Sequence, residues 1–478
     1  MSIITGTSNR GNMMGVTRNE ALILACMVCA ILMNGIDGSI VSVALPSIAG
    51  YFGTGLSEVA WVTICYIMMM AGLLLPFGRI ANSGRVRQVF VTGFMVFTAA
   101  SFFCGISENF GMLLAFRVVQ GAGAAMMAST APIICVKLMP SRIMGLSLGV
   151  MTLASATGYT IGPFIGGIIT EVSDWHWIFL VNVPIGILAI LFGLKVLPKE
   201  TRTAAHTDMP GTATLFVAIT AMIIAIERST DPGSRMLCMS MAVVFVISLI
   251  AFIIVERRSS DPLLDLSIFR NWRLDAVVLA FGLINLIYLG ALYILPFYLD
   301  GPMGLGSAAS GSILLIPSAI ALIMGIPIGR ACDRRGKRKF AILAGVFNVV
   351  YCVLLTVIRP EMGLLPVIVM SVFMGLLWGT CGASSSGRIV DNVPKTYRGM
   401  GSALMSFVNY TGSAMGTAVF AALMTIGSGA SGVPLEELTT SAFMDGMQFS
   451  GICAIALSLV ALACAYIVKE KRDVSPED

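Results

Sequence analysis

Long runs of apolar residues, separated by short polar segments, dominate the pattern along the chain. A membrane-spanning helix needs about 20 mostly apolar residues, and no strand-like alternation competes with the helical pattern. Backbone polar groups in lipid must bond within their own segment, so each run is predicted to be a transmembrane helix. The fourteen predicted spans cover residues 21–48, 58–78, 88–107, 110–136, 143–169, 177–197, 211–227, 236–255, 274–299, 305–328, 339–358, 363–387, 399–427 and 446–468.

The basic residues test this span count, because loops on the cytoplasmic side are enriched in Lys and Arg. With the N-terminal tail in the cytoplasm and the loops alternating sides, 26 of the 30 Lys and Arg residues fall on the inner side. The outer loops hold Arg228, Arg235 and Arg359, and Arg117 falls inside a span. A wrong count would exchange the sides of all later loops. We therefore expect fourteen spans, with both termini in the cytoplasm.

The composition excludes a soluble protein. Of the 478 residues, 57% are hydrophobic and only 12% are charged, whereas a soluble domain carries about 25% charged residues. The net charge of +5 comes from the loops, so it indicates topology and not nucleic-acid binding. His176 and His206 are too few for a His-based metal centre, and Cys26 and Cys29 form a C-x-x-C pair within an apolar run. We expect no metal and no cofactor.

Two polar segments divide the chain into halves. Residues 198–210 and 256–273 flank a pair of spans with almost no polar side chains. The expected organisation is a cytoplasmic tail (1–20), a six-helix half (21–197), a two-helix insert with flanking cytoplasmic loops (198–273), a second six-helix half (274–468) and a cytoplasmic tail (469–478). The fold class is all-α, with spans arranged six, two and six.

A short internal repeat supports the two halves. Gly78–Arg87 and Gly329–Arg338 are both basic, glycine-containing segments, and each follows the second span of its own half. Parallel repeats of this kind are typical of transporters. The alternative is that short cytoplasmic turns are generally basic and rich in glycine.

Both segments resemble the loop motif of the major facilitator superfamily, G-x-L-A-D-R-x-G-R-K. The second copy keeps the acidic residue as Asp333, whereas Asn82 replaces it in the first copy. The resemblance implies that these segments latch the two halves together at the cytoplasmic side, with Asp333 as the better gate candidate. The candidate gate residues are Gly78, Arg79, Asn82, Gly84, Arg85, Gly329, Asp333, Arg334 and Gly336.

Four further segments are similar to motifs of the fourteen-span drug:proton antiporter branch of this superfamily. They are Ile36–Pro46, Arg117–Ala125, Gly158–Gly167 and Trp175–Gly186. The similarity runs from about residue 20 to residue 470. It implies a major-facilitator-type fold and an antiporter, not an enzyme.

Asp37 lies well inside the first predicted span. A carboxylate at that depth is expensive, so it is expected to face a cavity, find a partner or bind a proton. Burial favours its neutral form and a nearby cation its charged form, so it can exchange a proton for a cationic substrate. The alternative is a structural Asp bonded to Ser39 or Ser42.

Arg117, in the fourth span, is the matching buried cation, since a guanidinium keeps its proton in proteins. The resemblance implies that it faces the central cavity and senses the protonation of Asp37. A direct contact between Asp37 and Arg117 is our hypothesis, and Gln120, one turn later, can share the network. The alternative is an Arg117 side chain that reaches the outer surface.

Gly158, Gly162 and Gly166 recur every four residues, which places three positions without side chains on one helix face. Such a stripe predicts close helix packing, and Pro163 predicts a kink or hinge. The resemblance implies that this segment, with Gly167, seals the halves against proton leak and permits rocking.

Other polar and aromatic residues within the spans are candidates to line a substrate cavity. For Trp and Tyr, anchoring at the membrane surface is the alternative. The candidates are Asn34, Trp61, Tyr66, Gln120, Asn285, Tyr288, Tyr293, Trp378 and Asn409.

The sequence predicts a plasma-membrane antiporter that exports lipophilic cationic compounds in exchange for protons. Its partners are a small-molecule substrate, protons and the bilayer; we expect a monomer that binds no nucleic acid. It lacks a G-x-x-x-x-G-K-[ST] loop, so ATP-driven transport has no chemical basis. Two alternatives remain open: an exporter of an endogenous metabolite, siderophore or other anionic compound, attracted by Arg117, and a non-transporting membrane receptor on the same fold.

Overall fold

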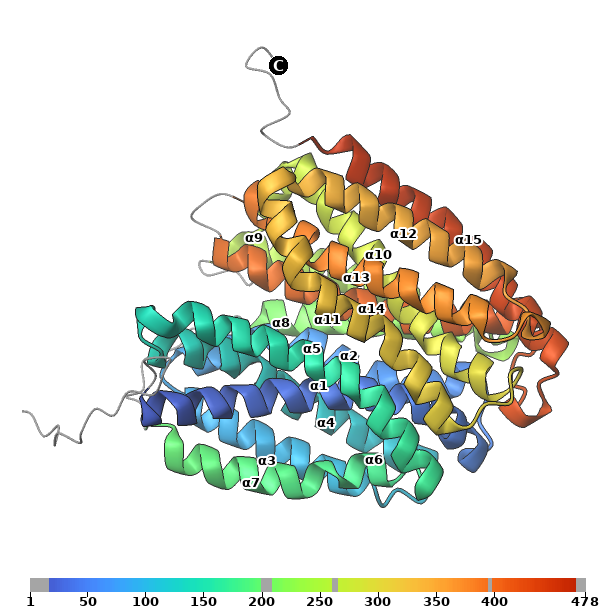
Figure 1. Ribbon diagram of the computed structural model, residues 1–478, viewed down its shortest axis with the longest axis horizontal. Coiled ribbons are helices and arrows are strands. Elements are labelled where there is room, and N and C mark those ends of the chain that lie inside the picture. Colours follow the sequence, from blue (N-terminus) through green and yellow to red (C-terminus); the bar gives the residue numbers. More distant parts are fainter. Residues whose placement is uncertain (1–16, 199–208, 260–264, 394–397, 470–478) are drawn as a thin grey trace, which may run out of the picture.

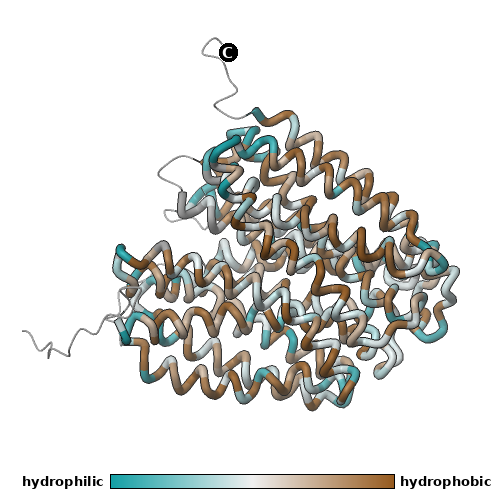
Figure 2. Tube along the Cα trace, in the orientation of Figure 1, coloured by the Kyte–Doolittle hydropathy of each residue, from teal (hydrophilic) through white to brown (hydrophobic). Residues whose placement is uncertain are grey.

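The computed structural model describes residues 17–198, 209–259, 265–393 and 398–469. These residues form helices and turns, with no strand among them. The long helices run side by side in two bundles, with α1–α7 in the lower bundle of Figure 1 and α10–α15 in the upper one. Figure 2 shows apolar residues along the helices and polar residues at their ends, as expected for segments that cross a bilayer.

The first bundle contains α1 (Arg18–Phe52), α2 (Leu56–Asn82), α3 (Val86–Cys104), α4 (Phe110–Leu138), α5 (Ser141–Val172), α6 (Trp177–Leu180) and α7 (Asn182–Val196). The insert contains α8 (Met209–Arg228) and α9 (Arg235–Arg258). The second bundle contains α10 (Trp272–Asp300), α11 (Ser307–Arg335), α12 (Lys337–Val357), α13 (Leu365–Asn392), α14 (Arg398–Ser428) and α15 (Thr440–Ile467). α8 packs against α2 and α14, and α9 packs mainly along α8.

Thirteen helices of the described residues are long and apolar enough to cross a membrane, which confirms the all-helical membrane fold class. α6 and α7 count as one of them, because the backbone at Val181 between them is still helical. α14 is a 31-residue helix but is not among the thirteen, so the count of fourteen spans stays a prediction.

Several predicted boundaries were wrong. α1 does not end near residue 48 but continues through Pro46 to Gly53, whose left-handed backbone (φ 62°) ends the helix. The two basic repeats were predicted as turns, yet Gly78, Arg79 and Asn82 still belong to α2. Likewise Gly329, Asp333 and Arg334 belong to α11. The turns themselves are only a few residues long and centre on Gly84 and Gly336, which have φ values of 80° and 92°.

The gate role of these segments stays a prediction. The backbone carbonyl of Asn82 accepts a hydrogen bond from Lys137 Nζ at 2.8 Å, which is a contact within the first bundle. The side chain of Asp333, the better gate candidate, lies outside the described residues.

We name the two ends of the bundles from the orientation that the basic residues predict. The outer end holds the connections α1–α2, α5–α6, α10–α11 and α14–α15, and the inner end holds α2–α3, α4–α5 and α11–α12. Three polar contacts between the bundles lie at the outer end. Ser57 Oγ is 2.9 Å from Thr425 Oγ1, the Leu435 N–H donates to the Thr54 carbonyl at 3.3 Å, and the Tyr293 hydroxyl donates to the Leu56 carbonyl.

Candidate coupling centre

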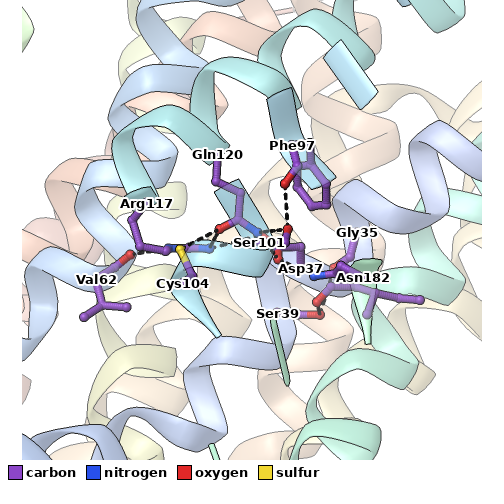
Figure 3. Close-up of polar contacts among 11 residues, drawn as sticks. Gly35, Asp37, Ser39, Val62, Phe97, Ser101, Cys104, Arg117, Gln120 and Asn182 are labelled. Carbon is purple, nitrogen blue, oxygen red and sulfur yellow. Dashed lines mark hydrogen bonds and ion pairs between the residues drawn. The ribbon is translucent and has the colours of Figure 1, made fainter. Parts of the chain in front are cut away.

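Four helices bring a polar cluster together inside the first bundle (Figure 3). Asp37 on α1 is fully buried and accepts three hydrogen bonds. Arg117 Nη1 on α4 donates to its Oδ2 at 3.1 Å. Gln120 Nε2, also on α4, and Asn182 Nδ2 on α7 donate to its Oδ1 at 2.9 Å and 3.0 Å. We call Asp37, Arg117, Gln120, Asn182 and Ser101 of α3 the coupling centre.

Arg117 is held on all sides. Its Nε donates to the Val62 carbonyl at 2.8 Å, and its Nη1 also donates to Gln120 Oε1 at 2.7 Å. The Tyr66 ring lies 4.3 Å from the guanidinium carbon, a cation–π contact. Arg117 is 1% exposed, so the hypothesised contact with Asp37 is present and the alternative of an Arg117 at the outer surface is wrong.

The charges of the centre balance, and its hydrogen bonds are connected. Burying two ions costs several kcal/mol each unless they are paired and otherwise satisfied. Gln120 ties the pair together, since its Nε2 donates both to Asp37 and, at 2.8 Å, to Ser101 Oγ. Ser39 and Ser42 bond to backbone carbonyls instead, so the alternative in which they hold Asp37 is wrong.

Asn182 and Ser101 were not predicted from the sequence as residues of this site. Asn182 lies in the quoted segment Trp175–Gly186, and a polar residue within an apolar span is a signal for it. Ser101 has no comparable signal, because a serine in a membrane helix commonly bonds to its own backbone, as Ser101 Oγ also does with the Phe97 carbonyl at 2.7 Å.

The glycine stripe of α5 packs directly on α1. A Cβ added at Gly158 would lie 2.7 Å from the Leu32 carbonyl oxygen, and one at Gly166 would lie 2.7 Å from the Ile40 carbonyl oxygen. A Cβ at Gly162 would lie 2.0 Å from Ser39 Oγ. The predicted close packing is therefore confirmed, and it sets the position of α1 on both sides of Asp37.

The opposite face of α5 contacts the second bundle. An added Cβ at Gly167 would lie 2.3 Å from the Ser307 carbonyl oxygen of α11, and one at Gly311 would lie 2.4 Å from the Pro163 carbonyl oxygen. α5 is continuous through Pro163, and the predicted hinge at this residue stays a prediction.

Replacing Gly158 by Ala is expected to reduce the free energy of unfolding by about 1–3 kcal/mol, because the methyl group must push α1 away. Gly149, on the same helix, is the matched control, since a Cβ there meets no atom within 4 Å. Gly149→Ala should leave stability unchanged or raise it slightly. Unfolding of the detergent-solubilised protein measures both; equal effects of the two variants would contradict the packing account.

The candidate cavity residues of the first bundle have different environments. Asn34 is buried, and its Nδ2 donates to the Ala124 carbonyl at 3.4 Å, not to Asp37. Tyr66 is 1% exposed and lies against Arg117. Trp61 is half-buried and packs against the core. Of the candidates in this bundle, Gln120 is part of the coupling centre and Tyr66 lies against it.

In the second bundle, Tyr288 and Trp378 stack with ring centroids 4.8 Å apart. Tyr293 is used in the contact with Leu56 between the bundles. Asn285 is fully buried and donates to the Phe281 carbonyl of its own helix at 2.7 Å, and the Asn409 carbonyl accepts from Ser413. Their role as cavity lining stays a prediction.

The two bundles repeat the same helix contacts. Gly121 of α4 packs on the Tyr66 carbonyl of α2, as Gly375 of α13 packs on the Pro317 carbonyl of α11. Gly162 of α5 packs near the Ile36 carbonyl of α1, as Gly416 of α14 packs on the Leu286 carbonyl of α10.

Counting along the helices from these matched contacts, the equivalents of Asp37, Arg117 and Gln120 are Ile287, Ser371 and Met374. All three are fully buried. The second bundle thus has the same packing at this level without the charges, so the coupling centre is a property of the first bundle.

The described residues contain no group of three or more His, Cys, Asp or Glu side chains that could hold a metal ion. A buried ion pair within a bundle of long apolar helices is typical of integral membrane proteins that move ions or substrates. A family model described as "Major Facilitator Superfamily" matches residues 27–417. The chain therefore belongs to the Major Facilitator Superfamily and is a membrane transporter, not an enzyme.

The chain is similar to several transporters at 27–29% identity. Riboflavin transporter RibZ of Clostridioides difficile is 27% identical over 84% of this chain and 88% of its own. Puromycin resistance protein pur8 of Streptomyces alboniger is 28% identical over 95% of this chain and 92% of its own. Multidrug transporter protein MdtP of Bacillus subtilis is 29% identical over 66% of this chain and 58% of its own.

Solved structures share the fold. A bacterial homolog of the human lysosomal transporter Spinster, in an inward-facing and unoccupied conformation, has a TM-score of 0.68 at 14% identity, covering 95% of this chain and 98% of its own. A POT family transporter in complex with a thioalcohol-conjugated peptide has a TM-score of 0.67 at 13% identity, covering 95% and 96%. At these identities the likeness concerns the fold alone.

Proposed function

We propose that the protein is a proton-coupled secondary-active antiporter that exports lipophilic cationic compounds by alternating access. The observation that carries the proposal is the fully buried pair of Asp37 and Arg117 within the first bundle. Ionisable residues at this depth are costly and mark ion and proton pathways. Relatives named for multidrug transport and for puromycin resistance support the drug-like substrate class.

Proton and cation compete through the charge of Arg117 in this proposal. With Asp37 charged, the ion pair is neutral as a whole and a cationic substrate is tolerated nearby. With Asp37 protonated, Arg117 is an uncompensated positive charge. At a distance of about 8 Å and an effective dielectric constant of about 20, its repulsion of a cation is about 2 kcal/mol, or about thirtyfold in affinity.

This competition does not require the cation to touch Asp37, which is closed off by its three donors. We therefore place the cation near the centre but out of contact with Asp37, at a distance at which the charge of Arg117 still acts on it. This modifies the expectation from the sequence, in which Asp37 itself received both proton and cation.

The contacts between the two bundles at the outer end, which we call the outer seam, support alternating access. In this proposal the described structure is the inward-facing state. The close glycine contacts between α5 and α11 lie towards their outer ends, at Pro163, Gly167, Ser307 and Gly311. Towards the inner ends, a Cβ added at Gly149 of α5 or Gly325 of α11 meets no atom within 4 Å. Rocking of the two bundles would open the outer seam and close the inner end.

Glu171 is a testable part of this seam. Its Oε2 accepts a hydrogen bond from the Ala308 N–H at 2.7 Å, at the start of α11. Gly306, the N-cap of α11, has no side chain to do this, so α5 caps α11 across the seam. The helix dipole disfavours a carboxylate at the C-terminal end of its own helix, but favours one at the N-terminal end of a neighbouring helix.

Glu171→Ala should therefore shift the population towards the outward-facing state by about fivefold, given the strength of a solvent-screened bond to a charge. Spin labels at the exposed inner positions Leu148 and Ile326 report the shift as a shorter distance between α5 and α11. Glu108→Ala, at another exposed outer position of the same bundle, is the control. Equal distance distributions in both variants would contradict the role of Glu171.

The anionic-substrate alternative rests on Arg117 as the attractive charge, and the similarity to a riboflavin transporter is the observation that favours an endogenous metabolite. Transport in inverted membrane vesicles with an imposed pH gradient separates the candidates. We expect uptake of cationic dyes and none of anionic metabolites. Transport of the metabolites alone would establish the alternative, and transport of neither would favour the receptor.

We further propose that the protein lies in the plasma membrane with both termini in the cytoplasm, and that it acts as a monomer with fourteen spans. The distribution of the basic residues supports this orientation. The single coupling centre, complete within one chain, supports a monomer as the transporting unit.

A further inference from the structure

Asn182 is the one donor to Asp37 described above that comes from α7 and not from α4. It is 2% exposed and is the first residue of α7, which packs mainly on α3 and also on α1. Its Nδ2 donates to Asp37 Oδ1 at 3.0 Å, the same oxygen that receives Gln120 Nε2 at 2.9 Å. The bond links α7 to α1 across the interior of the first bundle.

The three partners differ in what they can offer to a protonated Asp37. A charged carboxylate only accepts hydrogen bonds, whereas the neutral carboxyl also donates one and therefore needs an acceptor. Arg117 carries donors only. Gln120 is already fixed at both ends, by Arg117 Nη1 on its Oε1 and by Ser101 Oγ at its Nε2. The Asn182 amide carries both a donor and an acceptor, and a half-turn of the amide exchanges them.

We propose that Asn182 is a positioning residue that follows the protonation of Asp37, donating to the charged carboxylate and, after rotation of its amide, accepting from the neutral carboxyl. This inference rests on the proposed proton coupling at Asp37. On proton uptake the Asp37 Oδ1–H bond forms, the Nδ2–H···Oδ1 bond breaks, and the Oδ1–H donates to the Asn182 carbonyl oxygen. No electron is transferred.

Other titratable groups around Asp37 do not replace this role. Arg117 of α4 is the charged neighbour, and Tyr66 of α2, Cys104 of α3 and Tyr159 of α5 are within electrostatic range. Cys104 points its sulfur to Gln120 Oε1 at 3.9 Å and not to Asp37. Arg117 has no acceptor and Gln120 is held at both ends, so Asn182 is the partner of the carboxylate that can offer an acceptor.

The test is infrared difference spectroscopy of the purified full-length protein during a pH titration. We expect a carboxyl band that titrates, accompanied by a change in an asparagine amide carbonyl band. Labelling asparagine with ¹³C at the side-chain carbonyl should move that second band, which identifies it without any substitution. A titrating carboxyl band without an asparagine signal would overturn the role of Asn182 and leave proton binding at Asp37 intact; no titrating carboxyl band would overturn the proposed function itself.

Asn182→Leu should remove the amide signal. It should also raise the pH midpoint of the carboxyl band by about one unit, since the bond lost to the charged form is about twice as strong as the one lost to the neutral form. Asn348→Leu is the matched control, a fully buried asparagine on α12 of the other bundle, and should change neither observation. A midpoint that stays at the wild-type value in Asn182→Leu would contradict the proposal.

Discussion

Asp37→Asn is expected to abolish accumulation of a cationic substrate against its gradient, while substrate exchange persists with an affinity about thirtyfold weaker, because Arg117 is then uncompensated. Each pH unit across the membrane supplies about 1.4 kcal/mol to a one-for-one exchange, which sustains about tenfold accumulation. Asn cannot release or take up a proton, so the variant loses this driving force. Arg117 keeps its bonds to the Val62 carbonyl and Gln120 and its contact with Tyr66, so the fold is expected to survive.

Inverted vesicles with a pH gradient of one unit measure the accumulation, and vesicles preloaded with unlabelled substrate measure the exchange. Asp445→Asn, an exposed acid on α15, is the control and should behave as the wild type. Tenfold accumulation that persists in Asp37→Asn would rule out Asp37 as the coupling residue. Loss of both accumulation and exchange would mean that Asp37 is needed for substrate binding itself.

Arg117→Met is expected to make stability depend on pH. Without the guanidinium, the buried carboxylate of Asp37 avoids its desolvation cost by taking up a proton. The folded variant then holds a proton that the unfolded chain releases above its ordinary carboxyl range, so stability is present at low pH and is lost as pH rises. Between pH 5 and pH 8, up to about 1.4 kcal/mol is lost per pH unit relative to the wild type.

Denaturant unfolding at several pH values in one detergent measures this slope. The double variant Asp37→Asn/Arg117→Met lacks the titrating group, so the added slope of the single variant should be absent from it. A steep slope that remains in the double variant would assign the effect to another group. A flat profile in the single variant would show that Gln120 and Asn182 are sufficient to hold the charged carboxylate.

The depth of Asp37 and Arg117 could be predicted from the sequence, because position within an apolar run gives the distance from the membrane surface. The rotation of each helix about its axis and the order of the helices around the bundle are harder to predict from the sequence than depth is. This is why Asn182, one of three donors to the carboxylate, entered the sequence analysis only as part of a motif.

The glycine stripe of α5 is a second case in which the sequence does not show which helices are neighbours. Its spacing predicted one close-packed face of α5, and the structure adds that this face meets α1 beside Asp37, while Gly167 meets α11 across the seam. Helix ends were also hard to predict, since Pro46 marks no end and the helices carry the basic motifs almost to Gly84 and Gly336. The internal repeat was visible in the sequence, whereas the absence of an ion pair at Ile287 and Ser371 needed the matched contacts of the two bundles.

The central claim is that export is coupled to proton movement through Asp37. The most direct measurement follows internal pH in proteoliposomes that contain the purified protein and a pH indicator, after ethidium is imposed as a gradient with no initial pH difference. The account predicts proton flux opposite to ethidium, in proportion to it, and none in Asp37→Asn. Ethidium transport with no change of internal pH, or with the same proton flux in Asp37→Asn, would contradict it.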